Sequence, residues 1–142
     1  MSGRVVLIGG AGFIGRALTP ALSAAGWEVR VIDRATADAT DAVALGRAVV
    51  PADLVVHLAF PTDHATRARD PATTAAQVAR AAHNVAAFAR AASASHVILA
   101  SSGKVYGAAA PVPVDEATAP APTTFLGTLK CDDEARFAAA AD

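Results

Sequence analysis

The segment GGAGFIG, residues 9–15, has the composition of a backbone phosphate-binding turn. Its glycines Gly9, Gly12 and Gly15 have the spacing GxxGxxG. The first permits a tight turn, the second lets backbone amides approach a pyrophosphate, and the third lets a helix pack closely on a strand. The start of that helix would add about half a positive charge toward the anion. Because ordinary turns also collect glycines, the prediction depends on a strand directly before this segment and a helix directly after it.

Asp33 follows Gly15 by eighteen residues, at the end of the next apolar run. A carboxylate at this place can accept hydrogen bonds from both hydroxyls of an adenosine ribose. Because it would repel a 2'-phosphate, it favours NAD over NADP. Arg34 keeps NADP open, because an arginine beside that carboxylate can pair with the 2'-phosphate. The alternative for Asp33 is a solvated carboxylate that merely ends a strand. We expect a dinucleotide site for NAD, with NADP as the alternative.

Apolar runs and amphipathic segments alternate along the chain and would supply the elements that position these residues. We expect strands over 4–8, 27–33, 53–60 and 96–102 and helices over 13–25, 42–49 and 72–92, with a last helix from Phe125 or Leu126. This alternation predicts a Rossmann-like, doubly wound parallel sheet in a three-layer α/β/α fold with right-handed crossovers. Pro20 is expected to kink the first helix or to cost up to about 3 kcal/mol. Residues 61–71 should form a loop, and the proline-rich residues 107–124 an extended connection.

Composition narrows the partners of the chain. Its 142 residues suit one domain, and its net charge of −1, without a run of basic residues, provides no electrostatic footprint for nucleic acid or for an anionic membrane. The single cysteine, Cys131, has no partner for an internal disulfide, and no Cys/His cluster predicts a metal site. The first residues, MSGRVVLIGG, lack the longer apolar stretch and the small-residue cleavage site typical of a signal peptide, and no uninterrupted apolar stretch reaches about eighteen residues. We therefore expect a cytoplasmic protein.

Five segments together resemble the extended short-chain dehydrogenase/reductase family, the NAD-dependent epimerase/dehydratases of nucleotide sugars. They are VVLIGGAGFIG, DLVVHLA, NVAAFARAA, VILASSGKVYG and TTFLGTLK, in this order and at compatible spacings. The resemblance implies an NAD(P)-binding Rossmann domain over 1–142 that is incomplete at its C-terminus, because the substrate lobe of that family comes largely from later residues. It also implies hydride transfer to or from a sugar-nucleotide or a related carbonyl or alcohol substrate. A homodimer is a further expectation.

The resemblance also implies which residues touch the cofactor. The backbone around Gly12, Phe13 and Ile14 would hold the pyrophosphate, and Asp33 the adenosine ribose. The stretch DATD is similar to one that touches the adenine in the family, which implies Asp38. Only residues 34–37 separate these two acids, so we expect the sheet to lack an outer strand.

The stretch HLAF resembles the HLAA of the family, whose backbone lines the cofactor cleft. It implies cleft positions for Leu58, Ala59 and Phe60, and a structural role for His57. Asn84, in the long helix, is likewise expected to be structural.

The catalytic set of the family is matched only in part. Ser102 corresponds to the hydroxyl that holds the substrate oxygen, and Lys130 to the lysine that grips the nicotinamide ribose. The tyrosine that transfers the proton is replaced by Leu126, and Val78 stands where the family has an asparagine that supports the proton path. Tyr106, the only tyrosine, occupies a position that packs beside the site in the family. We expect the 142 residues alone to lack catalytic activity. The alternatives are a protein that binds a dinucleotide without catalysing a reaction, or a chain that neither binds a dinucleotide nor converts a substrate.

Overall fold

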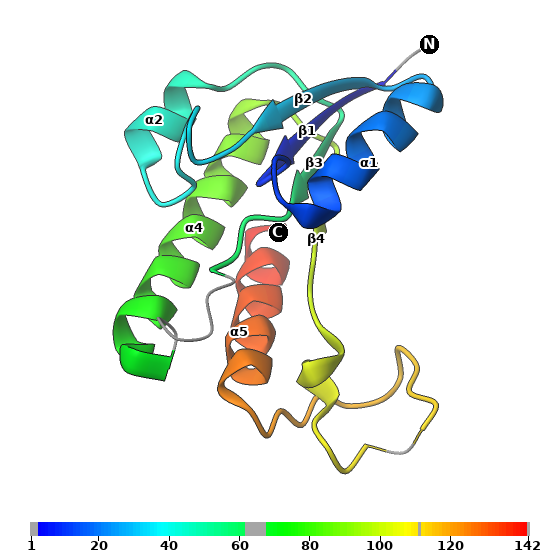
Figure 1. Cartoon of the computed structure of the whole chain (residues 1–142), viewed down its shortest axis with the longest axis vertical. Helices are drawn as coiled ribbons and strands as arrows, with labels where there is room; N and C mark the ends of the chain where they lie inside the picture. The colour runs from blue at the N-terminus through cyan, green and yellow to red at the C-terminus, as the bar shows by residue number, and fades with distance from the viewer. Residues whose placement is uncertain (1–2, 62–67, 111, 142) are drawn as a thin grey trace.

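The structure, a computed structural model, describes residues 3–61, 68–110 and 112–141 (Figure 1). Within these residues the chain forms a sheet of four strands: β1 (Arg4–Ile8), β2 (Glu28–Ile32), β3 (Leu54–His57) and β4 (His96–Leu99). The strands lie in the order β2-β1-β3-β4, and every neighbouring pair is parallel. Ile8, the last residue of β1, is opposite Ile32 on one side and His57 on the other. The carboxyl ends of these strands therefore meet at one edge of the sheet.

Helices cover both faces of this sheet. They are α1 (Phe13–Ala24), α2 (Ala42–Arg47), α4 (Pro71–Ala91) and α5 (Phe125–Ala140). A short 3-10 helix, η1 (Gly103–Tyr106), follows β4 and lies beyond the sheet. Figure 1 shows α1 on one face and α2, α4 and α5 on the other. The three-layer, doubly wound α/β fold predicted from the sequence is thus confirmed. None of the helices in the described ranges is both long enough and apolar enough to cross a membrane.

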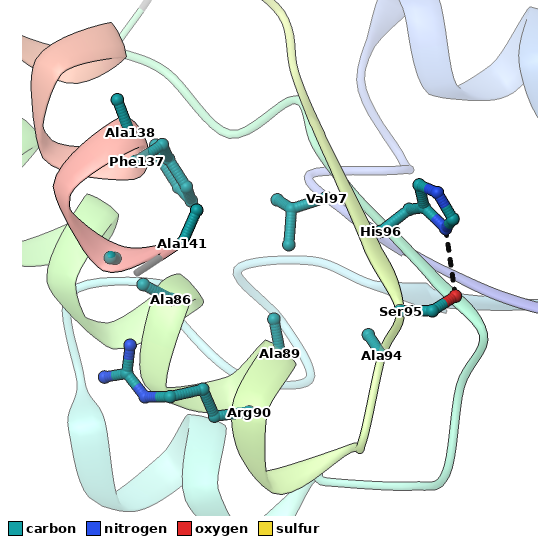
Figure 2. Close-up of a pocket in the computed structure, with 11 residues that line it drawn as sticks. Ala86, Ala89, Arg90, Ala94, Ser95, His96, Val97, Phe137, Ala138 and Ala141 are labelled. Carbon is teal, nitrogen blue, oxygen red and sulfur yellow. Dashed lines mark hydrogen bonds between the residues drawn. The ribbon is translucent and has the colours of Figure 1, made fainter.

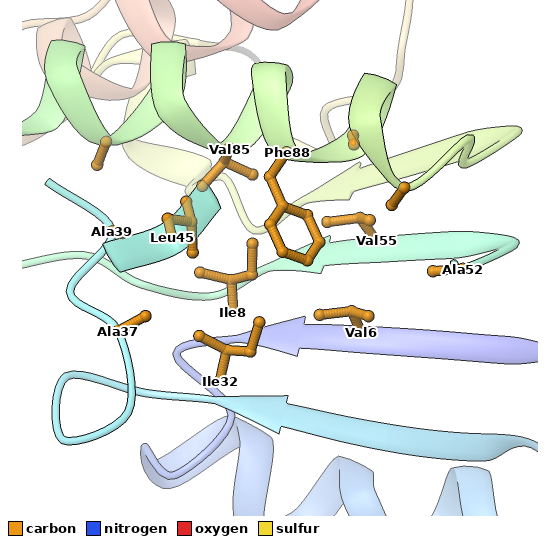
Figure 3. Packing of buried hydrophobic residues seen from close by; sticks show 13 residues of the cluster. Val6, Ile8, Ile32, Ala37, Ala39, Leu45, Ala52, Val55, Val85 and Phe88 are labelled. Carbon is orange, nitrogen blue, oxygen red and sulfur yellow. The ribbon is translucent and has the colours of Figure 1, made fainter. Parts of the chain in front are cut away.

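The larger hydrophobic core lies between the sheet and α4 (Figure 3). Val85 and Phe88 of α4 pack over Val55 of β3 and Ile8 of β1, and alanines let the helix approach closely. The buried members of this cluster are Val6, Ile8, Ile32, Ala37, Ala39, Leu45, Ala52, Val55, Ala81, Val85, Phe88, Ala89 and Ala92. A smaller cluster on the opposite face joins Val5, Leu7 and Val56 to the partly buried Leu18 and Leu22 of α1. Apolar residues on both faces explain the uninterrupted apolar run of β1.

Several boundaries differ from the expected ones. The third strand was expected to extend to residue 60 but ends at His57, and the fourth was expected to extend to residue 102 but ends at Leu99. The sequence did not predict η1, which begins after Ser102 because the Ser102 hydroxyl caps it. The helix α1 continues past Pro20 to Ala24.

Two long connections were expected, over residues 61–71 and 107–124. The loop expected over 61–71 falls mostly on residues 62–67, outside the described residues. Residues 107–124, without residue 111, contain turns instead of a continuous extended segment. One such turn is closed by Asp115, whose carboxylate accepts hydrogen bonds from the amide of Ala117 and the hydroxyl of Thr118.

The segment between β2 and α2 holds no strand, since the described residues 33–41 form turns, as the short spacing predicted. β2 is accordingly an edge of the sheet. Asn84 of α4 fixes this segment, because its buried side-chain amide donates a hydrogen bond of 2.9 Å to the carbonyl oxygen of Ala39. This contact gives Asn84 the structural role that was expected of it.

Candidate functional site

A cavity of about 1080 Å³ lies at the carboxyl edge of the sheet. Its lining comes mainly from the segments that follow β1, β2 and β3, which the strand order brings side by side. In open parallel sheets this is where ligands bind. Eleven of the residues predicted to hold a cofactor line this one cavity: Gly9, Gly12, Phe13, Ile14, Gly15, Asp33, Arg34, Asp38, Leu58, Ala59 and Phe60. Residues distant in the sequence thus converge on one site.

The turn after β1 requires glycine at two of the predicted positions. Gly9 has φ +85°, in the left-handed region, and a Cβ atom there would come within 2.5 Å of the Ala59 amide nitrogen. At Gly15, a Cβ atom would overlap the backbone of Gly10. These close approaches hold the start of α1 against β1 and β3. The roles assigned to the first and third glycines, a tight turn and close helix packing, therefore agree with the geometry.

The N-terminus of α1 opens into this cavity with free backbone donors. Gly12 is the N-cap residue, and no side chain caps the helix. The first amide with a partner inside the helix is that of Arg16, which donates to the Gly12 carbonyl at 3.0 Å. The preceding amides, those of Phe13, Ile14 and Gly15, have no intrahelical acceptor. Together with the helix dipole, such amides form an anion-binding site.

Asp33 stands directly after β2, at the β2 end of the cavity. Its Oδ1 atom accepts hydrogen bonds from the amides of Ala35 and Thr36, each at 3.0 Å, which fix the carboxylate. None of the hydrogen bonds found among the described residues uses Oδ2. One carboxylate oxygen is thus held by the protein, and the other is left for a ligand.

Arg34 and Asp38 lie beside Asp33 and face each other. The Nε atom of Arg34 is 4.0 Å from Oδ2 of Asp38, and the Arg34 side chain is 86% exposed. Asp38 accepts hydrogen bonds from the amide and the hydroxyl of Thr40 at 2.8 and 2.7 Å. These bonds, from the backbone first and then from the side chain, hold the pKa of Asp38 below its usual value, so Asp38 is ionised. An exposed ion pair of this length is weak, which leaves the Arg34 guanidinium available to another anion.

The two residues predicted to be catalytic do not line the cavity. Ser102 accepts a hydrogen bond of 3.2 Å from the amide of Lys104 at the start of η1. Lys130 is 6% exposed and donates a hydrogen bond of 2.7 Å to the carbonyl oxygen of Ala100. Its ammonium lies 3.9 Å from the centroid of the Phe60 ring, and Phe60 is the residue that reaches the cavity. Leu126, one turn earlier on α5, is half-buried.

Sequence reasoning missed Asp133, a buried acid that does line the cavity. Its side chain is 1% exposed, and its Oδ2 atom is 3.9 Å from Nζ of Lys130. Neither carboxylate oxygen has a hydrogen-bond partner. Burial raises the pKa of Asp133 despite the nearby ammonium of Lys130, and burial lowers the pKa of Lys130. The signal in the sequence was the i, i+3 spacing from Lys130, which puts both residues on one face of a helix.

His57 lies at the same end of the cavity. It is 3% exposed, its ring packs 5.6 Å from that of Phe137, and its Nδ1 atom has no hydrogen-bond partner. Burial, and then the charge of Lys130, lower the pKa of His57 to about 4. The imidazole is thus neutral near pH 7.

A second cavity, of about 450 Å³, lies at the other end of the sheet, beside the start of β4 (Figure 2). Its lining is mainly alanine from α4 and α5, with Arg90, Ser95 and His96 as polar members. The hydroxyl of Ser95 and Nδ1 of His96 are 2.9 Å apart and hydrogen-bonded to each other. Within the part of the chain that the structure describes, no group of three His, Cys, Asp or Glu residues is placed to hold a metal ion. The carboxyl-edge cavity, on which the predicted cofactor residues converge, is the candidate site.

The sequence of residues 5–129 matches the model of the NAD dependent epimerase/dehydratase family. The chain belongs to this family. Comparison with curated proteins found no significant match. Membership agrees with the resemblance that the five sequence segments carried, and the matched range includes every residue that lines the candidate site except Asp133.

Solved structures share the fold of this family member. A dTDP-4-dehydrorhamnose reductase from Bacillus anthracis, in complex with NADP, superposes with a TM-score of 0.86 at 23% identity, over 99% of this chain and 50% of its own. A UDP-glucose 4-epimerase from Brucella ovis, in complex with NAD, superposes with a TM-score of 0.85 at 24% identity, over 99% of this chain and 48% of its own. A short-chain dehydrogenase/reductase superfamily protein from Agrobacterium tumefaciens, with bound NAD, superposes with a TM-score of 0.80 at 27% identity, over 94% of this chain and 43% of its own. The chain spans about half the length of these structures.

Proposed function

We propose that the chain is the NAD(P)-binding domain of an epimerase/dehydratase-type oxidoreductase. The observation that carries this proposal is the convergence of the glycine turn, Asp33 and the segment 58–60 on one cavity. Family membership supports it, and so do the NAD and NADP complexes of the structures with the same fold. In the whole protein the substrate would be a nucleotide sugar or a related carbonyl or alcohol compound.

The residues present fit a dinucleotide. The free amides of Phe13, Ile14 and Gly15 would donate to the pyrophosphate, which the start of α1 also attracts electrostatically. The Oδ2 atom of Asp33 would accept hydrogen bonds from the hydroxyls of the adenosine ribose. A bound nicotinamide supplies the site with a hydride acceptor or donor. NAD is favoured over NADP because Asp33 repels a 2'-phosphate, whereas the exposed guanidinium of Arg34 is the feature that would admit one.

A second candidate function, a dinucleotide-binding protein without chemistry, has an observation of its own. Lys130 is directed to the carbonyl of Ala100, and Leu126, at the family tyrosine position, carries no proton to transfer. A missing acid or base typically lowers a rate by a factor of about 100 to 10,000. Reduction of NAD by secondary alcohols or nucleotide sugars, abolished by Ser102→Ala, would refute this second function.

The extent of the domain, the cellular location and the assembly remain predictions from the sequence. We propose that residues 1–142 form one cofactor-binding domain and that a substrate lobe completes the site in the whole protein. A cytoplasmic location and a homodimer are proposed on the same footing. Size-exclusion chromatography with light scattering would test the homodimer directly.

Calorimetric titration of the chain with NADH, and then with NADPH, tests the main proposal. We expect saturable binding of both, tighter for NADH. Circular dichroism must first establish that the purified chain is folded. A folded chain that releases no heat with either dinucleotide would contradict the proposed function.

A further inference from the structure

The cavity extends from Asp33 across the glycine turn to a far end over β3. Asp33 follows β2, the turn follows β1 and the segment 58–60 follows β3, and these strands are neighbours in that order. A dinucleotide with its adenosine ribose at Asp33 and its pyrophosphate on the turn must therefore direct its second half toward β3. The groups at that end are those that would meet the second ribose.

Two buried side chains at this end have polar atoms without hydrogen-bond partners. The atoms are both carboxylate oxygens of Asp133 and Nδ1 of His57. Lys130 does not satisfy Asp133, because 3.9 Å is too long for a hydrogen bond and the ammonium already donates to Ala100. Buried polar groups are nearly always hydrogen-bonded, so these unpaired atoms indicate a ligand that supplies donors.

A carboxylate with two free oxygens selects the chemistry of that ligand. It repels phosphate, and it matches a pair of neighbouring hydroxyls, each of which donates one hydrogen bond. At the opposite end Asp33 would bind the adenosine ribose through one oxygen only, because its Oδ1 atom already accepts from the amides of Ala35 and Thr36. Asp133 is almost completely buried, so a neighbouring side chain must move to admit a ligand. Phe60, which is half-buried, lines the same cavity and lies over the Lys130 ammonium, is the side chain that we expect to move.

We propose that Asp133 binds the hydroxyls of the second ribose of the dinucleotide, the ribose that carries the nicotinamide. This inference rests on the proposed function and adds a residue to its site. Asp133 comes from α5, so the cofactor would tie this helix to the sheet. Lys130, directed to Ala100, holds its ammonium beside Asp133 and favours the ionised carboxylate that accepts these hydroxyls.

Three ligands of increasing length test the proposal by calorimetry. ADP lacks the second ribose, ADP-ribose contains it, and NADH adds the nicotinamide. For Asp133→Leu we expect the affinity for ADP-ribose and NADH to fall about tenfold, and for Asp133→Asn by a smaller factor, because a charge-assisted hydrogen bond is lost or weakened. The affinity for ADP should stay within about twofold. The control Asp132→Asn removes the same charge from an exposed neighbour on α5 and should change none of the three affinities.

The outcomes separate the inference from the proposed function. If wild type binds ADP and NADH but neither variant weakens ADP-ribose binding, the inference is overturned and the proposed function stands. Equal weakening of ADP and ADP-ribose would show that Asp133 acts only through the fold, and a loss confined to NADH would show a contact with the nicotinamide instead; both overturn the inference. If wild type binds none of the three ligands, both are overturned.

Discussion

Asp133 and Lys130 form a buried ion pair one turn apart on α5, with 3.9 Å between Oδ2 and Nζ. The two side chains are 1% and 8% exposed, and the pair has no direct hydrogen bond. Removing two charges from water is expensive, and an attraction at this distance compensates for it only in part. The pair is therefore weak support for stability, yet the loss of one partner alone leaves a buried charge without compensation.

A double-mutant cycle measures this asymmetry. Lys130→Met should lower the free energy of unfolding at pH 7 by roughly 3 kcal/mol, because it leaves the buried Asp133 carboxylate without a counter-charge and removes the hydrogen-bond donor to the Ala100 carbonyl. Adding Asp133→Leu should restore most of that loss. Urea denaturation of the three variants gives the cycle, with Lys104→Met, the same change at an exposed position of η1, as the control. A double variant no more stable than Lys130→Met would show that the charge of Asp133 is already compensated.

Two glycine-to-alanine changes, one in the glycine turn and one in α2, should have opposite effects on stability. Gly15→Ala would overlap the backbone of Gly10, so it should lower the free energy of unfolding by about 1–3 kcal/mol and abolish NADH binding. Gly46→Ala, inside α2, meets no atom within 4 Å and should raise that free energy by up to about 1 kcal/mol, with binding unchanged. Urea denaturation and calorimetry measure both. Normal NADH affinity in Gly15→Ala would refute the close packing of α1 on the turn.

The charges after β2 should set the preference between NAD and NADP. Asp33→Asn keeps an oxygen that accepts from the Ala35 and Thr36 amides, so the turn persists while the charge is lost. We expect NADH affinity to fall about tenfold, because the hydrogen bond from the ribose loses its charged acceptor. NADPH affinity should rise, because the repulsion of a 2'-phosphate is removed. Arg34→Ala should weaken NADPH more than NADH. Calorimetric titrations measure both ratios, and an unchanged NADH to NADPH ratio in Asp33→Asn would exclude Asp33 from the ribose site.

Much of this site could be predicted because its parts are local and the topology is simple. The glycine spacing of residues 9–15 lies within one turn, and Asp33 ends the following strand. Parallel pairing with short crossovers then brings both to one edge of the sheet. Continuous apolar runs and a spacing of about 3.6 residues were sufficient to predict strands and helices to within a few residues, except where β3 and β4 end early.

The α5 side of the cavity could not be predicted in the same way, because contacts distant in the sequence determine it. Gly127 lets α5 pack directly on η1, since a Cβ atom there would overlap the carbonyl of Lys104. Phe137 packs against His57 of β3. These contacts turn Lys130 toward Ala100 and Asp133 toward the cavity. The sequence indicates that Lys130 and Asp133 share a face of the helix, but not what that face meets.

His57 should make the fold sensitive to acid. Its pKa is about 4 in the folded chain against an ordinary value of 6.5, so the unfolded chain binds more protons between these values, and stability is lost as the pH falls from 6.5 to 4. The shift corresponds to about 3 kcal/mol. His57→Phe keeps a ring against Phe137 and should remove that part of the pH dependence.

The measurement is the free energy of unfolding from urea denaturation at several pH values, taken as the difference between variant and wild type. Asp133 and Lys130 also have shifted pKa values, but their contributions to the pH dependence of stability largely cancel in this difference. His83→Gln, at an exposed position of α4, is the control. Parallel pH profiles for wild type and His57→Phe would contradict the buried, neutral imidazole.

Leu126→Tyr would test whether the surroundings of Lys130 still suit a reactive tyrosine. Residue 126 is four before Lys130 on α5, so a phenol there would lie on the same face as the ammonium. The nearby positive charge should lower the pKa of that phenol by about one unit from its ordinary value of about 10. Absorbance of the phenolate against pH measures it in a Tyr106→Phe background, where the new tyrosine is the only one. Adding Lys130→Met should bring the pKa back up, and identical titration curves with and without Lys130 would show that α5 no longer brings the two positions together.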